Sequence, residues 1–87
     1  MGMTVAEANK AIGAELRAAR AKRDYSREEL SDLSGVPVMT IRRAEAGTAA
    51  IKAPTLIALC RALEVPVGPL MDLVAEQIDK AGGLDPE

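Results

Sequence analysis

Apolar residues along this 87-residue chain recur every three or four positions, which is the spacing of one face of an α-helix. The first such run extends from Thr4 to about Lys22 and predicts a long first helix. Thr4 with Glu7 three residues later forms a capping box, which indicates where this helix begins. β-Branched residues do not alternate with polar ones over a useful length, so we expect no strand.

Two shorter helices are predicted in the middle of the chain. Ser26 and Glu29 have the spacing of a second capping box, and the helix they open ends near Gly35, which suits a left-handed C-terminal position. A third helix is expected over 37–46, because proline is tolerated as a first helical residue. Gly47 ends it.

Two further helices are expected after a connecting loop over residues 48–53. The fourth opens at Pro54 or Thr55, and the fifth opens at Gly68-Pro69 and reaches about residue 80. Five short helices predict an all-α fold with a single domain over residues 1–81. Residues 82–87 are expected to form a flexible tail.

Composition limits the chemistry of this domain. The hydrophobic content of 48% favours a folded chain, and Tyr25 is the only aromatic residue, so the core must be aliphatic. There is no histidine, and Cys60, the only cysteine, is expected to be a small core residue. We therefore expect no internal disulfide, no metal site, no cofactor and no catalytic residue.

Charge is distributed unevenly around a net value of −2. Residues 17–43 carry seven basic and four acidic side chains, whereas residues 44–87 carry three basic and seven acidic ones. A basic middle followed by an acidic half favours one surface that faces DNA and another that faces elsewhere, although a mixed solvated surface has the same composition. The chain lacks a membrane-spanning run and a signal pattern, so we expect a soluble, intracellular protein with no membrane partner.

The central segment has the features of a helix-turn-helix, in which two short helices flank a tight glycine turn. Leu30 and Leu33 are expected to pack beneath the first of these helices, and Gly35 to take the turn. Val36 and Ile41 are expected to lock the second helix against the first. The alternative is an ordinary helical hairpin.

These residues resemble the Cro/phage-repressor (XRE) family of helix-turn-helix DNA-binding proteins, over about residues 12–71. The resemblance is carried by Leu16-Arg17, Arg20, Ser26 to Leu30, Ser34 to Val36, Thr40-Ile41, Arg43, Glu45 to Gly47, Thr55-Leu56, Leu59, Ala62-Leu63 and Val65.

The resemblance implies that the third helix enters the major groove of double-stranded DNA with its N-terminal end first. Arg43 is expected to bond guanine, while Val38 and Met39 offer apolar contact to a thymine methyl group. The alternatives are a solvated surface arginine at position 43 and partial core packing at Met39. Contacts with the DNA backbone, or mixed contacts, are expected from Ser26, Arg27, Pro37, Thr40, Arg42, Thr48 and Lys52.

The family also indicates roles for three further positions. Arg20 and Glu45 match a pair that forms an internal ion pair, which implies that Glu45 holds the third helix to the first. Arg27 stands where the family usually has glutamine, so it is expected to bind phosphate more strongly, with a guanine contact as the alternative.

The resemblance also implies a homodimer on a pseudo-palindromic operator. The candidate dimer surface is the stripe on the fifth helix, although the same stripe would also serve to close the core of a single chain. Its members are Leu70, Leu73, Val74, Gln77 and Ile78.

The function expected from these features is that of a transcription repressor, as in a phage switch, in the nucleoid of a bacterial or phage-infected cell. Two alternatives remain open. One is an antitoxin whose acidic C-terminal half binds a protein partner, and the other is a protein-interaction adaptor that has kept the fold without base reading.

Overall fold

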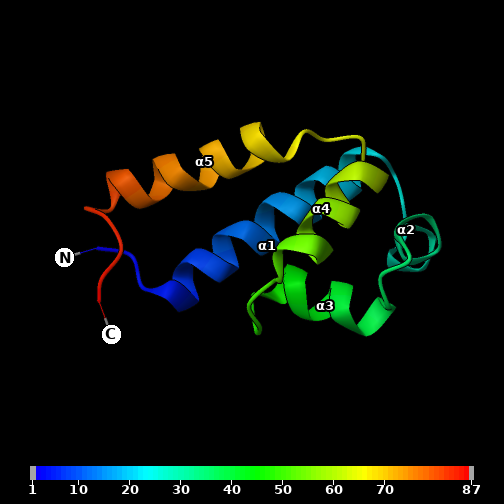
Figure 1. The fold of residues 1–87 in the computed structure, drawn as a ribbon, viewed down its shortest axis with the longest axis horizontal. Helices are drawn as coiled ribbons and strands as arrows, with labels where there is room; N and C mark the ends of the chain where they lie inside the picture. The colour runs from blue at the N-terminus through cyan, green and yellow to red at the C-terminus, as the bar shows by residue number, and fades with distance from the viewer. Residues whose placement is uncertain (1, 87) are drawn as a thin grey trace.

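Five α-helices joined by short connections make up residues 2–86, the part of the chain that the computed structural model describes (Figure 1). The only extended pairing among these residues is one isolated bridge between Met3 and Leu84, so the predicted all-α fold is confirmed. The helices are α1 (Val5–Lys22), α2 (Arg27–Ser34), α3 (Val38–Ala46), α4 (Ala53–Ala62) and α5 (Val67–Lys80).

Both capping boxes form at the helix starts where their sequence spacing placed them. The Thr4 hydroxyl accepts from the Glu7 backbone at 3.1 Å, and the Glu7 carboxylate accepts from the Thr4 backbone at 3.0 Å. Ser26 and Glu29 exchange the same two bonds at 3.0 and 2.9 Å. Hydrogen bonds from Thr4 and Ser26 lower the pKa of Glu7 and Glu29 respectively, because they stabilise the ionised carboxylates.

The later helices each begin one or two residues from the positions that the sequence suggested. Pro37 occupies the N-cap of α3 and not its first turn, because its ψ of 143° is extended while its carbonyl already accepts from Ile41. Helix α4 begins at Ala53 and helix α5 at Val67, in both cases before the proline that marks the first turn.

Two glycines determine how α3 is placed. Gly35 ends α2 with a φ of 76°, a left-handed conformation that glycine adopts without steric cost. Gly13 lies in α1 directly against the end of α3: a Cβ atom there would collide with the carbonyl oxygen of Ala44 and approach that of Glu45 to 2.7 Å. The absence of a side chain at Gly13 therefore lets the backbones of α1 and α3 meet.

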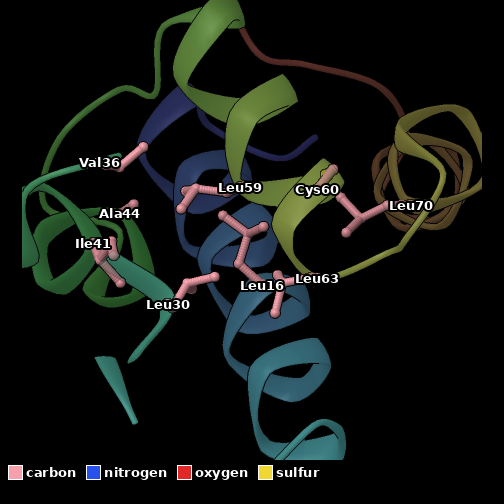
Figure 2. Packing of buried hydrophobic residues seen from close by; sticks show 9 residues of the cluster. All are labelled: Leu16, Leu30, Val36, Ile41, Ala44, Leu59, Cys60, Leu63 and Leu70. Atoms are coloured by element: carbon pink, nitrogen blue, oxygen red, sulfur yellow. The ribbon is translucent and has the colours of Figure 1, made fainter. Parts of the chain in front are cut away.

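The core is built mainly from aliphatic side chains that converge from all five helices (Figure 2). Leu16, Leu30, Ile41, Leu59 and Leu63 are each at most 2% exposed. Cys60 is buried beside them, and burial raises the pKa of its thiol, so it packs as a neutral side chain.

Leu33 does not pack as expected, because its side chain is 58% exposed. It lies three residues after Leu30, which turns it about 60° around α2 from that buried position. An eight-residue helix buries only a narrow stripe in this fold, and Leu33 falls outside it.

Helix α5 lies along α1 on the side away from α3 (Figure 1). The tail beyond it, which the sequence predicts to be flexible over residues 82–87, contacts the first residues described: Met3 forms two backbone hydrogen bonds with it, to Gly83 at 2.8 Å and from Asp85 at 2.9 Å. Gly2 adds a bond from its backbone to the Asp85 carboxylate at 2.8 Å. Residues 83–85 are therefore held against the start of the chain.

Candidate DNA-binding surface

Helix α3 divides its residues between an inner and an outer face. Ile41, Ala44 and Glu45 are buried, at 1%, 3% and 5% exposure. Because each residue turns the helix by about 100°, Met39 and Arg43 share the opposite face, four residues apart. The structure leaves both side chains exposed, Met39 at 56%.

The three residues expected to read bases are thus not equivalent. Met39 and Arg43 point outward together, whereas Val38 is half-buried. Arg43 forms no side-chain hydrogen bond or ion pair with any residue in the range 2–86, and its guanidinium is available to a ligand.

The residues expected to contact the DNA backbone come from the start of α2, from α3 and from the loop that follows α3. Two of them already have a role in capping a helix: the Ser26 hydroxyl accepts from Glu29, and the Thr48 hydroxyl donates to the Arg43 carbonyl at 3.4 Å. Thr40 and Arg27 are half-buried, and the exposed members are Ser26, Pro37, Arg42, Thr48 and Lys52.

A shallow hollow of about 300 Å³ lies between α3 and the loop that leads to α4. Thr40 and Arg43 line it from α3, and Lys52 and Thr55 line it from the loop and the start of α4. This arrangement brings two cations and two hydroxyl groups from separate segments around one concave surface. Such a surface suits a phosphodiester, which is anionic and accepts hydrogen bonds.

Behind this face, Glu45 receives a two-pronged ion pair from α1. Arg20 donates from Nε to Glu45 Oε2 at 2.7 Å and from Nη2 to Oε1 at 3.0 Å. Its remaining amino group donates to the Tyr25 carbonyl at 2.9 Å. The hydrogen bond with Glu45 raises the pKa of Arg20, which therefore stays charged. This pair attaches α3 to α1.

A second arginine binds the same carboxylate, which sequence reasoning missed. Arg27, the first residue of α2, donates from Nε to Glu45 Oε1 at 3.0 Å. The Glu45 side chain is only 3% exposed, so it lies buried between the two guanidinium groups. The partners are 18 residues apart, a separation at which spacing along the chain carries no signal of contact.

A further unpredicted contact closes the end of α1 against the end of α4. Arg23 donates from Nε to the Leu63 carbonyl at 3.0 Å and pairs with Glu64 at 3.0 Å. Both side chains of the pair are largely exposed, so its contribution to stability is small.

The stripe on α5 separates into two groups. Leu70 and Val74 are buried within the single chain, at 4% and 1% exposure, so they close its core and are not available to a dimer surface. Leu73 is 48% exposed, Gln77 is exposed beside Glu15 of α1, and Ile78 is half-buried.

Other chemistry finds no support among residues 2–86. These residues contain no group of acidic or cysteine side chains that could hold a metal ion, and none of their helices is long and apolar enough to cross a membrane.

A family described as "Helix-turn-helix" matches residues 16–70. The chain belongs to this helix-turn-helix family. The matched range contains α2, α3, α4 and most of the core, and the resemblance to the XRE proteins is confirmed. No curated protein sequence shows significant similarity to the chain.

Two crystal structures of the clp gene regulator ClgR from Corynebacterium glutamicum are similar to this helix-turn-helix protein. One has a TM-score of 0.73 and 28% identity and covers 79% of this chain and 90% of its own. The other has a TM-score of 0.75 and 25% identity, with coverages of 86% and 80%. Together with the family match, they support a DNA-binding transcription regulator, a class that is generally not enzymatic.

Proposed function

We propose that this helix-turn-helix protein is a sequence-specific regulator that represses transcription as a homodimer on a pseudo-palindromic operator. The observation that carries the proposal is the pair Met39 and Arg43. Both are exposed on the outer face of α3, while Glu45 on its inner face is fastened to two other helices. A rigidly held helix with free outer side chains suits insertion into the major groove.

In the proposed complex, Arg43 donates two hydrogen bonds to guanine O6 and N7. Met39 contacts a thymine methyl group, and the half-buried Val38 adds a second apolar contact. Thr40, Arg42 and the other backbone candidates determine register, because phosphate contacts are the same at every sequence. With a single polar base reader, one domain is expected to discriminate only modestly.

A second copy of the chain supplies the other half of the site in this proposal. The proposed surface is a groove of about 570 Å³ between α1, the end of α4 and α5. Leu73 is its exposed apolar side chain, and Ala18, Leu63 and Val65 line it. Because α5 lies on the side of α1 away from α3 (Figure 1), joining two chains here leaves both copies of α3 free for DNA.

Selection from a random duplex library followed by gel shift tests this function. We expect enrichment of a two-fold symmetric motif with half-sites about 34–36 Å apart, one turn of DNA. Retention of DNA without any enriched motif contradicts base reading, and no retention at ~100 mM salt favours the adaptor role. Light scattering at micromolar concentration tests the dimer, and a 9.1 kDa species that binds singly contradicts it.

The charge of the second half of the chain favours one other candidate, an antitoxin. Residues 44–87 carry seven acidic and three basic side chains, which suits a basic protein partner in the cytoplasm. Co-purification with the product of the neighbouring gene tests this role. A partner that is released by salt supports the antitoxin role, whereas the absence of any co-purifying protein contradicts it.

A further inference from the structure

The two arginines on Glu45 differ in how fully the protein engages them. Arg20 uses all three nitrogens of its guanidinium, on Glu45 and on the Tyr25 carbonyl, and its side chain is 15% exposed. Arg27 uses only Nε, its side chain is 33% exposed, and its Nη1 and Nη2 have no hydrogen-bond partner among residues 2–86. The two terminal amino groups of Arg27 can therefore still donate hydrogen bonds to a ligand.

The charges around Glu45 also do not cancel. Two guanidinium groups share one carboxylate, so the cluster of Arg20, Arg27 and Glu45 keeps a net charge of about +1. Arg27 is moreover the first residue of α2, where the positive end of the helix dipole disfavours a cation. An anion placed at the free side of Arg27 relieves both effects.

The position of Glu45 decides which part of DNA that anion belongs to. Glu45 is buried on the inner face of α3, opposite the outer face that exposes Met39 and Arg43. A guanidinium held by Glu45 is therefore displaced from the base edges that those outer side chains reach. Its planar fork of N–H groups matches a phosphate in geometry and charge.

We propose that Glu45 is a positioning residue for DNA binding: its bond to Arg27 Nε holds that side chain with both terminal amino groups free for one phosphate. The proposal rests on the proposed DNA-binding function and assigns Arg27 to the backbone and not to a guanine. It also couples two parts of the interface, because one buried carboxylate fastens the recognition helix and orients the phosphate contact.

Two substitutions of Arg27 separate its charge from its positioning. Arg27→Lys keeps the charge but replaces the fork that spans Glu45 and the phosphate with a flexible amine, whereas Arg27→Gln removes the charge. Arg61→Lys and Arg61→Gln on α4 are the matched controls, because Arg61 is exposed, is assigned no DNA contact, and forms no ion pair within residues 2–86. Fluorescence anisotropy with a selected duplex, between about 50 and 200 mM salt, gives affinity and salt slope together.

We expect Arg27→Lys to weaken binding about threefold to tenfold at each salt concentration, because the lysine must be ordered when the complex forms. Its slope of log K against log salt should stay that of the unsubstituted chain. Arg27→Gln should reduce the slope by about 0.9, the value of one phosphate contact. Arg61→Lys and Arg61→Gln should both stay within about twofold of the original affinity and keep its salt slope, because Arg61 is not among the residues assigned to DNA.

Several results overturn the inference. An Arg27→Lys variant that binds within twofold of the unsubstituted chain shows that positioning does not matter, and an unchanged slope in Arg27→Gln shows that no phosphate is contacted. Circular dichroism measures whether each variant is folded. If Arg27→Gln is unfolded, the comparison of Arg27→Lys with the lysine control tests the inference by itself. If the original chain selects no motif, its sequence-specific function fails, yet the slopes on a mixed-sequence duplex still test the phosphate contact.

Discussion

Helices α3 and α5 each bury one stripe of side chains and each expose one large apolar residue, but the surroundings of that residue differ. Met39 on α3 is 56% exposed and is followed by two exposed arginines, Arg42 and Arg43. Leu73 on α5 is 48% exposed and is flanked by the exposed acids Asp72 and Glu76. An apolar side chain among cations suits the DNA groove, whereas one among acids is repelled from phosphate and suits a protein surface.

The first difference between the two helices is that Glu45 attaches α3 to α1 and α2 through Arg20 and Arg27. Glu45→Ala leaves two arginines without their carboxylate, so we expect the free energy of unfolding to fall by about 3–5 kcal/mol. Urea denaturation followed by circular dichroism measures this loss. Glu76→Ala on exposed α5 is the control and should stay within about 0.5 kcal/mol. Equal losses of stability in Glu45→Ala and Glu76→Ala would show that Glu45 does not attach α3 to the rest of the fold.

A charge placed on α5 tests whether that helix faces protein. Leu73→Glu should weaken the proposed dimer by about 2–4 kcal/mol, because a central apolar contact is replaced by a buried charge. Sedimentation over a range of concentrations measures the dimer. Since Leu73 is half exposed, the fold of the single chain should survive. A dimer of unchanged affinity places the interface elsewhere.

Removing the base reader tests whether α3 faces DNA. Arg43→Ala should cost about 1–3 kcal/mol on the selected site and relax the preference at one base pair. Repeating the selection with the variant measures both effects. Arg61→Ala, an exposed arginine on α4, serves as the control. A uniform loss over all sequences would make Arg43 a backbone contact.

The smallest expected effect concerns the start of α2, which carries Arg27. Ser26→Ala removes the N-cap and should cost about 1 kcal/mol of stability. The lowered pKa of Glu29 adds a pH dependence: its contribution is present above the ordinary carboxyl pKa and is lost as the pH falls through the lowered value. Thermal melts from neutral to acidic pH should show a weaker acid dependence in Glu29→Gln, which removes the ionising group, and an unchanged one contradicts this origin.

Local features of the sequence predicted local features of the fold. The capping boxes at Thr4 and Ser26 and the left-handed Gly35 follow from contacts within a few residues, so their signals survive in the sequence. The prediction that Leu33 lies in the core is wrong. Helical spacing shows which residues share a face of a helix, but it does not show how much of that face the neighbouring helices cover. The pairing of Met3 with residues 83–85 joins the two ends of the described chain and left no local signal.

In the candidate DNA-binding surface, too, some features follow from the sequence and others only from the tertiary structure. Helical periodicity by itself determined that α3 has an inner and an outer face, and the family resemblance implied which of its residues contact DNA. Only the tertiary structure decided that Met39 and Arg43 are exposed while Val38 is half-buried, and that Leu70 and Val74 close the core while Leu73 remains outside it. Only the tertiary structure, too, brought Arg27 to Glu45, because hydrogen bonds between separate helices depend on how those helices pack, and packing is a property of the whole chain.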